Sequence, residues 1–154
     1  MSEHPDTERR LEVVKSFFAA IPHSAVLGIE PVAVTAEHVT ARIPYKAELV
    51  GNPDTGVVHG GVITTLVDQT CGAAVIAALD PPEVVVTLDL RLDHLQPAQP
   101  QQPIWAQAHC YRLTRHIAFV RCVVYQTTPA APIATSMSTF MRVTHEDPNP
   151  GRAV

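Results

Sequence analysis

The sequence is poor in aromatic residues and in positive charge, and each shortage narrows what the protein can be. Phe, Trp and Tyr make up only 5% of the 154 residues, so the core must be mainly aliphatic. Eleven Lys and Arg residues stand against 15 Asp and Glu residues, which gives a net charge of −4 at pH 7. Because no basic run exists to neutralise phosphates, we expect no binding to nucleic acid.

Cysteine is too sparse for a disulfide framework or a cysteine-rich metal site. Cys71, Cys110 and Cys122 are widely spaced, form no CxxC pair and lie among apolar or β-type residues. This is typical of small buried side chains in a reducing compartment. We therefore expect a cytoplasmic protein without a metal or a redox cofactor.

Long apolar runs are also lacking. The longest fully apolar run, residues 73–79, is far shorter than the ~20 residues that a membrane helix needs. The first ten residues are polar and charged, without the apolar centre of a secretory signal. We expect no membrane partner.

The chain has the size and composition of one globular domain. It is 46% hydrophobic, and neither a repeat nor a change of composition divides it, so a single domain over residues 1–154 is predicted. About six N-terminal residues and about ten C-terminal residues, from His145, are expected to be disordered because they are polar or rich in proline and lack periodicity.

Two helices are predicted from the spacing of apolar residues. The first runs from Thr7 to Pro22, with apolar positions at steps of three or four (Leu11, Val14, Phe18 and Ile21). The second opens at Gly60, is apolar on nearly all sides and is ended by Asp80-Pro81-Pro82. A helix that is apolar all round is buried by its surroundings.

Alternating apolar and polar residues predict the strands. A hairpin is expected over residues 32–45, and residues 46–58, with two glycines and Pro53, are expected to form a loop. Four strands follow at residues 84–93, 104–113, 117–126 and 133–143, joined by short turns that favour antiparallel pairing. The predicted fold class is α+β, with an antiparallel sheet wrapped around one long central helix. One sheet is not expected to cover that helix, so a homo-oligomer is predicted.

The candidate chemistry lies between Gly51 and Leu79. His59-Gly60-Gly61 opens the apolar helix, and bare amides at a helix N-terminus can hold a developing negative oxygen. Asp68 follows nine positions after His59, inside a helix where aspartate is a poor former. From the residues alone two structural alternatives stay open: His59 as a cap, and Asp68 on an exposed stripe.

The run from Asn52 to Gly61, followed by Leu66-Val67-Asp68, resembles the signature of hotdog-fold acyl-CoA thioesterases of the phenylacetic-acid-degradation type. The predicted order of elements agrees with that fold over residues 10–143. The resemblance implies hydrolysis of acyl-CoA, with coenzyme A entering as part of the substrate. It also implies active sites at the interface of a homodimer, which in this family often pairs into a tetramer.

The resemblance assigns roles to residues around the helix. Gly60, together with Gly61, would donate backbone N–H groups to the oxyanion. His59 would orient the carbonyl or the loop, and Asp68 of the partner subunit would act as general base or nucleophile. Thr87 falls where related enzymes place a serine that helps to hold the attacking water.

The resemblance also assigns residues to substrate binding. The segment His94-Leu95-Gln96-Pro97-Ala98 resembles one that lines the coenzyme A channel, and Arg115-His116 lies where a basic turn meets coenzyme phosphates. Gly72, with its neighbours Cys71 and Val75, is expected to shape the acyl pocket.

Two positions depart from the family pattern. Asn52, a further candidate site residue, precedes His59 by seven positions, whereas close relatives hold their asparagine six before. Thr114 stands where a glycine is common in the turn before Arg115.

Alternative functions remain open at this stage. A hydratase or dehydratase acting on acyl thioesters would need a histidine together with the carboxylate, and no histidine besides His59 is suitably spaced from Asp68. A non-catalytic acyl-CoA-binding protein is the third reading. The acyl group, aromatic or medium-chain aliphatic, is also open, as is the choice between dimer and tetramer.

Overall fold

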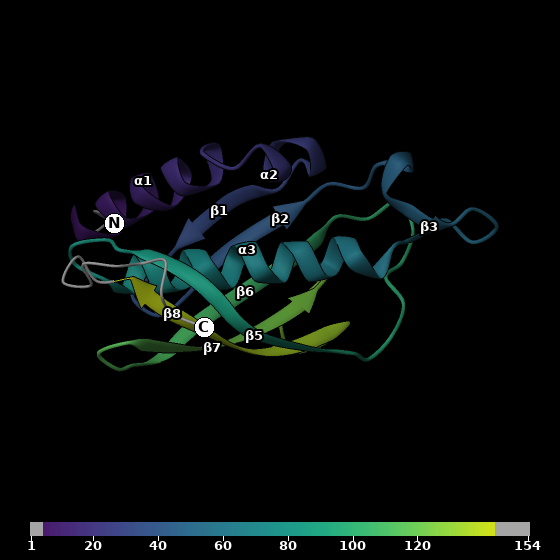
Figure 1. Cartoon of the computed structure of the whole chain (residues 1–154). Helices are drawn as coiled ribbons and strands as arrows, with labels where there is room; N and C mark the ends of the chain where they lie inside the picture. The colour runs from purple at the N-terminus through teal and green to yellow at the C-terminus, as the bar shows by residue number, and fades with distance from the viewer. Residues whose placement is uncertain (1–4, 144–154) are drawn as a thin grey trace.

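The computed structural model describes residues 5–143, which form a curved sheet wrapped around a central helix (Figure 1). The sequence predicts disorder for about six N-terminal residues and for the tail from His145; positions 1–4 and 145–154 lie outside the described residues, whereas residues 5 and 6 belong to a helix, so the expectation is wrong for these two. The elements, η1 being a short 3₁₀ helix, are α1 (Pro5–Ala19), α2 (Pro22–Leu27), β1 (Glu30–Val34), β2 (Val39–Ile43), η1 (Ala47–Leu49), β3 (Val50–Asn52), β4 (Val57–Val58), α3 (Gly60–Ala78), β5 (Val84–His94), β6 (Ile104–Leu113), β7 (Ile117–Tyr125) and β8 (Ala134–Val143).

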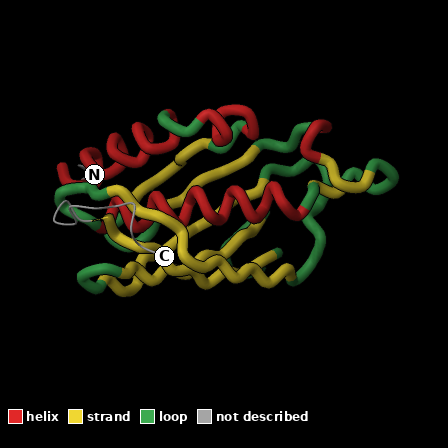
Figure 2. The backbone as a smooth tube through the Cα atoms, viewed as in Figure 1, coloured by secondary structure: helices red, strands yellow, loops and turns green. Residues whose placement is uncertain are grey.

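The main sheet has six strands in the order β1-β2-β6-β7-β8-β5, with neighbours antiparallel. In Figure 2 strands lie above, behind and below α3 in the view, and α1 and α2 lie at the top, above β1 and β2. The α+β class, with an antiparallel sheet wrapped around a long central helix, is therefore confirmed. The strand β5 is one edge of this sheet.

The helix α3 is the buried core of the fold. It is long and apolar enough to cross a membrane by length and composition, yet 72% of its most apolar 18-residue window is buried inside the protein. The helix α1 packs against α3 and β1. The N-terminal half of α3 keeps an uncovered stripe, on which Gly61 and Thr64 are exposed and Thr65 and Asp68 are half-buried.

The N-terminal segment differs in detail from the prediction. The helix α1 includes residues 5 and 6 and ends at Ala19, so it starts before Thr7. Pro22 does not lead directly into a strand but begins α2, because the fixed φ of proline suits the first turn of a helix. Gly28 then closes α2 with a φ of 77°, a left-handed conformation that favours glycine.

The prediction of an irregular loop over residues 46–58 is wrong. This segment contains η1 and a small hairpin of β3 and β4. A Cβ atom at Gly51 would lie 2.8 Å from His59 Cα, so only glycine lets β3 pass the start of α3 at this distance. Gly56 has a φ of 73° in the turn of the hairpin.

A β-bulge in β5 changes which side chains face α3. Thr87 pairs with Phe140 and Asp89 with Thr139, so Leu88 is the extra residue. Residues 85 and 87 face the helix before the bulge, and residues 90, 92 and 94 face it afterwards. The apolar residues that alternate in the sequence therefore do not share one face, and three of them are exposed: Val84 by 65%, Val86 by 46% and Leu88 by 53%.

Candidate active site

His59 caps the N-terminus of α3 with its own side chain. Its Nδ1 accepts a hydrogen bond of 2.9 Å from the Gly61 N–H, which requires the ring proton on Nε2 when His59 is neutral. The His59 carbonyl accepts from the Val62 N–H over 3.0 Å, and its N–H donates to the Leu49 carbonyl over 2.9 Å. The capping role that the sequence left open for His59 is therefore present in the structure.

These contacts leave the Gly60 amide available. The Gly61 N–H is engaged by His59, whereas the Gly60 N–H has no hydrogen-bond partner among the described residues. It lies in the first turn of a 19-residue helix, where the helix dipole favours negative charge. Of the two glycines predicted as donors, Gly60 is the one whose N–H can serve a ligand.

Asp68 lies next to Thr87. Thr87 Oγ1 donates a hydrogen bond of 2.8 Å to Asp68 Oδ1, which links β5 to the uncovered stripe of α3. The contact joins residues 19 positions apart, and the bulge at Leu88 places Thr87 on the side of β5 that makes it. The structure thus brings together two residues that the sequence assigned to the same chemistry.

Gly60 and Asp68 of one chain are far apart. Eight residues of α-helix separate them, which at 1.5 Å per residue is a rise of ~12 Å. A carbonyl that accepts a hydrogen bond from Gly60 is therefore out of reach of Asp68 of the same chain.

A hollow of about 410 Å³ lies at the start of α3. Gly60 and Ile63 form one side of it, and the predicted substrate-binding segment, residues 94–97, forms another. The His94 ring is close to Gly60, since Cε1 and Nε2 would each lie 3.6 Å from a Cβ atom built there. The structure therefore brings the donor glycine and the segment from His94 to Pro97 into one site.

Gly72 lies between aromatic rings at the covered half of α3. A Cβ atom at this position would lie 3.6 Å from Phe140 on β8 and 3.6 Å from Phe17 on α1. Cys71 and Val75, its predicted companions in the acyl pocket, are fully buried.

Asn52 is engaged in the hairpin between β3 and β4. Its side-chain oxygen accepts from the Asp54 N–H over 3.0 Å, and its carbonyl accepts from the Gly56 N–H over 2.8 Å. These are the bonds of a turn-forming asparagine. The Asn52 hydrogen bonds named above thus lie within the hairpin.

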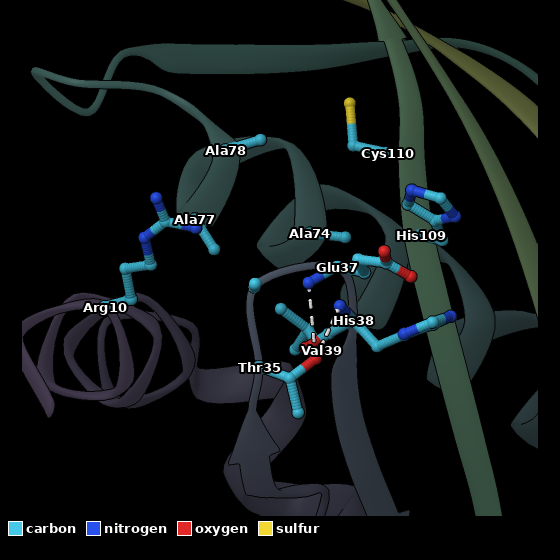
Figure 3. Close-up of a pocket in the computed structure, with 11 residues that line it drawn as sticks. Arg10, Thr35, Glu37, His38, Val39, Ala74, Ala77, Ala78, His109 and Cys110 are labelled. Atoms are coloured by element: carbon cyan, nitrogen blue, oxygen red, sulfur yellow. Dashed lines mark hydrogen bonds between the residues drawn. The ribbon is translucent and has the colours of Figure 1, made fainter. Parts of the chain in front are cut away.

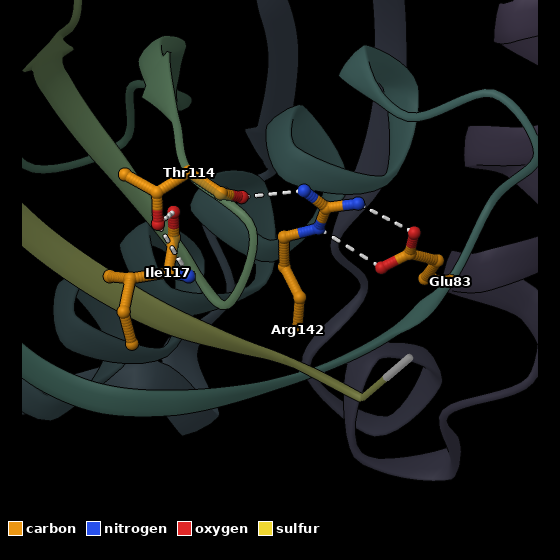
Figure 4. Close-up of polar contacts among 4 residues, drawn as sticks. All are labelled: Glu83, Thr114, Ile117 and Arg142. Carbon is orange, nitrogen blue, oxygen red and sulfur yellow. Dashed lines mark hydrogen bonds and ion pairs between the residues drawn. The ribbon is translucent and has the colours of Figure 1, made fainter. Parts of the chain in front are cut away.

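The turn with Arg115 and His116 lies at the opposite end of the sheet from His94. It is fixed by Arg142, whose Nη1 donates to the Thr114 carbonyl over 2.6 Å and whose guanidinium pairs with Glu83 (Figure 4). Thr114 Oγ1 accepts from the Ile117 N–H over 2.9 Å, so a threonine closes this turn where relatives use glycine.

The sequence did not predict that the His94 ring would lie beside Gly60. It also did not predict that Arg142 would hold the turn of Arg115 and His116. A histidine in the same alternating row as Leu90 and Leu92 is a signal that could have singled out His94. The pair of Glu83 and Arg142 spans 59 positions and leaves no local signal.

A second pocket, of about 50 Å³, lies near the C-terminal end of α3, and no predicted site residue lines it (Figure 3). The turn between β1 and β2 forms one wall, where Thr35 Oγ1 accepts from the His38 N–H over 3.0 Å. His109 lies 5.1 Å from His38 between ring centres. Burial, the neighbouring His38 and Arg121 lower the pKa of His109.

The cysteines have no disulfide partner, and two of them ionise less readily than usual. Burial raises the pKa of Cys110 to about 11. Contact with Cys71, then burial, raises the pKa of Cys122 well above its ordinary value. Among residues 5–143 no cluster of three or more His, Cys, Asp or Glu side chains is placed to hold a metal ion.

An antiparallel sheet wrapped around one long helix is the hotdog fold. Here that helix carries Asp68 on its uncovered stripe and a free Gly60 N–H at its start. The model of the thioesterase superfamily matches residues 55–133. A solved structure from Pseudomonas aeruginosa is 43% identical and covers 86% of this chain and 98% of its own, with a TM-score of 0.80. The chain belongs to the thioesterase superfamily, as the resemblance predicted.

More distant structures agree in fold. The E. coli PaaI protein from the phenylacetic acid degradation operon is 14% identical, with a TM-score of 0.78 over 90% of this chain and 96% of its own. A Haemophilus influenzae thioesterase is 24% identical, with a TM-score of 0.75 over 88% and 94%. A candidate esterase of Halobacterium salinarum is 38% identical over 76 residues, which is 47% of this chain and 50% of that protein. This match thus spans about half the length of the curated relative.

Proposed function

We propose that the protein hydrolyses acyl-CoA thioesters to a free acid and coenzyme A. The observation that carries this proposal is the unengaged Gly60 N–H at the start of α3, beside a hollow of about 410 Å³. The thioester carbonyl would rest on this amide with the coenzyme arm in the hollow. Membership of the thioesterase superfamily supports the same chemistry.

The amide would act on the transition state. When water or a carboxylate adds to the thioester carbon, the carbonyl oxygen becomes negative, and a fixed donor at that point lowers the barrier by about 3 kcal/mol. Gly60 needs no reorganisation to donate, because the helix fixes its N–H. The tetrahedral intermediate then re-forms its carbonyl and expels the coenzyme A thiolate.

Asp68 would supply the second half of the reaction, either by deprotonating water or by attacking to form a mixed anhydride. Its hydrogen bond from Thr87 Oγ1 holds one carboxylate oxygen at 2.8 Å and fixes the orientation of the other. Single-turnover hydrolysis in ¹⁸O-labelled water tests the nucleophilic role, because a mixed anhydride that water opens at the Asp68 carbonyl leaves an unlabelled Asp68 oxygen in the first acid product and puts ¹⁸O into Asp68.

We propose that two chains build each site. For Gly60 and Asp68 to act on one thioester, the acid would come from a second copy, because ~12 Å of helix separates the two residues in one chain. Two α3 helices packed antiparallel about Thr64 would set Gly60 opposite Asp68 of the partner subunit, because position 64 is midway between 60 and 68. Thr64 is exposed on the uncovered stripe of α3.

The edge of the sheet favours the same dimer. The strand β5 is a terminal strand and exposes apolar side chains, among them Val84 by 65% and Leu88 by 53%. An exposed apolar edge strand is a template for pairing with another chain. Pairing β5 with the β5 strand of a second copy would cover these side chains.

The antiparallel dimer also gives the distant turn a role. On β8, Ala134 pairs with His94 and Met141 pairs with Ile117, which follows the turn of Arg115 and His116. Ala134 and Met141 are seven residues apart, which is ~23 Å at ~3.3 Å per residue. In an antiparallel dimer, the end of the partner's sheet that holds this turn would lie near the hollow beside Gly60. We propose that Arg115 and His116 of the partner subunit contact the coenzyme phosphates.

One observation favours a second candidate, an acyl-thioester hydratase. Such an enzyme needs a histidine together with a carboxylate, and the His94 ring lies beside Gly60. In the proposed dimer His94 and Asp68 of the partner subunit would flank one thioester. Incubation with 2-enoyl-CoA distinguishes the two, because hydration removes the enoyl absorbance without releasing a thiol.

The test of hydrolysis is a panel of aromatic and medium-chain acyl-CoA substrates with a thiol reagent. Coenzyme A released by the native protein and not by Asp68→Asn supports the proposal. Tight binding of acyl-CoA without release would instead identify a non-catalytic acyl-CoA-binding protein. The profile across the panel would also show which acyl group is preferred.

The dimer has its own test. Thr64→Cys should form a disulfide between two chains under mild oxidation, because each Thr64 would lie near the two-fold axis. Val26→Cys, on α2 and 76% exposed in its native form, is the control that should not cross-link efficiently. Sedimentation of the native protein as a monomer at micromolar concentration would contradict the shared site, and the same experiment separates a dimer from a tetramer.

A further inference from the structure

His94 occupies an unusual place for a polar side chain. It ends β5 at an inward position, in the row that otherwise holds Leu90 and Leu92. Its ring does not pack into the core but borders the hollow at the start of α3, with Nε2 and Cε1 near Gly60. No hydrogen bond from the described chain engages the ring, so a ring N–H can serve a ligand.

The backbone around His94 is held firmly. His94 pairs with Ala134 on β8, and the N–H groups of Leu95 and Gln96 both donate to the Ile133 carbonyl, over 2.9 and 3.2 Å. Gln96 Nε2 donates to the Pro132 carbonyl over 3.2 Å. A donor on such a segment is preorganised, which is what stabilisation of a transition state requires.

The helix start leaves a place for a second donor. The Gly61 N–H is engaged by His59 Nδ1, and the Val62 N–H by the His59 carbonyl, so Gly60 contributes a single backbone bond. An oxyanion can accept more than one hydrogen bond. The glycine at position 60 leaves open the space between the helix backbone and the His94 ring.

We propose that His94 is a catalytic residue whose Nε2–H donates the second hydrogen bond to the oxyanion held by Gly60. This inference rests on the proposed hydrolysis. During attack the carbonyl π electrons move to the oxygen, and His94 donates a hydrogen bond without losing its proton. When the carbonyl re-forms, the thiolate leaves with the electrons of the carbon–sulfur bond.

The test compares three variants by kcat and KM with the best acyl-CoA substrate. His94→Leu and His94→Phe fill the space without a donor and should lower kcat about 100-fold, with KM changed less than about threefold. His94→Gln keeps an N–H donor, so its kcat should be at least about tenfold higher than that of His94→Leu. His23→Leu, the same change at an exposed position of α2, is the control and should leave kcat and KM unchanged.

The outcomes separate this inference from the function on which it rests. A native enzyme that releases coenzyme A, with His94→Leu equally fast or raised only in KM, overturns the role of His94 and leaves hydrolysis standing. Failure of His94→Gln to exceed His94→Leu also overturns it, provided both variants melt as the native protein does. A native protein that releases no coenzyme A, or that hydrates 2-enoyl-CoA instead, overturns both.

Discussion

Thr87 Oγ1 donates a hydrogen bond of 2.8 Å to Asp68 Oδ1, and this bond fixes the one acid of α3 to the edge strand of the sheet. Asp68 is half-buried and Thr87 is exposed in the single chain. A carboxylate held through one oxygen keeps the other free to take a proton or to attack. The hydrogen bond therefore restricts the orientation of the Asp68 carboxylate.

The first prediction concerns this bond. Thr87→Val keeps the shape of the side chain but removes the hydroxyl, and we expect kcat to fall about 10-fold with KM nearly unchanged, because a hydrogen bond to a charged group is worth about 1.5–3 kcal/mol at most. Thr87→Ser should retain most of the activity. Thr139→Val, on the outer face of β8, is the matched control. Equal activity of Thr87→Val and the native enzyme would contradict a positioning role.

The fold could be predicted from the sequence because apolar periodicity reports burial directly. The all-round apolar pattern after Gly60 predicted the central helix, and period-two alternation predicted the six main strands. The hairpin of β3 and β4 was missed because its strands have only three and two residues and depend on the contact of Gly51 with His59. Such contacts between segments leave no periodic trace.

The site could be predicted only in part. The glycine-opened helix and the acid within it are local features, so the sequence could single out Gly60 and Asp68 as candidates, and their catalytic roles stay a prediction. The bulge at Leu88, which turns Thr87 toward Asp68, interrupts a perfectly regular alternation of side chains and has no signal in that pattern. The engagement of Gly61 by His59 likewise depends on the rotamer of one ring.

A second prediction concerns two glycines that differ in their surroundings. Gly51→Ala places Cβ 2.8 Å from His59 Cα, so backbone must move, and we expect a loss of about 1–3 kcal/mol in the free energy of unfolding. Gly72→Ala places Cβ in ordinary contact at 3.6 Å and should stabilise the helix by up to about 1 kcal/mol. Chemical denaturation measures both.

The Gly72→Ala variant also reports on the site. If Gly72 shapes the acyl pocket, Gly72→Ala should disfavour the longest acyl-CoA substrates while melting at or above the native temperature. An unchanged acyl profile would remove Gly72 from the substrate-binding residues without affecting the stability argument.

A third prediction concerns the thiols. Because the pKa of Cys110 is about 11, against an ordinary 9.0, few thiolates exist at pH 8, and we expect its alkylation to be at least about tenfold slower than that of a free thiol. The rate should rise with pH up to about 11. The unfolded thiol ionises first, so the free energy of unfolding should fall as pH rises from about 9 to 11. All three cysteines should react at once in denaturant.

The thiol measurement is also a control for the hydrolysis assay. It gives the rate at which the protein's own cysteines react with a thiol reagent used to detect released coenzyme A. Alkylation with mass spectrometry at several pH values identifies the cysteine concerned. Rapid modification of Cys110 in the native protein at pH 7 would show that its thiol is not shielded as described.

The last prediction concerns the ion pair behind the turn of Arg115. Arg142 and Glu83 are only 17% and 16% exposed, and their shortest contact is 2.6 Å. Arg142→Met leaves a poorly solvated carboxylate and removes the bond to the Thr114 carbonyl, so we expect a loss of about 2 kcal/mol in the free energy of unfolding. Combining it with Glu83→Gln should cost less than the sum of the single changes. Arg9→Met, which breaks an exposed pair with Asp80, should leave the free energy of unfolding nearly unchanged.

The turn connects this stability effect to function. If Arg142 positions Arg115 and His116 for the coenzyme phosphates, Arg142→Met should raise KM for acyl-CoA about threefold to tenfold with little change in kcat, whereas substrates with the shorter pantetheine arm alone should be unaffected. Urea denaturation and steady-state kinetics on the same samples measure both effects. An equal rise in KM for acyl-CoA and for the pantetheine thioester would place the phosphates elsewhere, because the lost contact would then not concern the nucleotide end of the substrate.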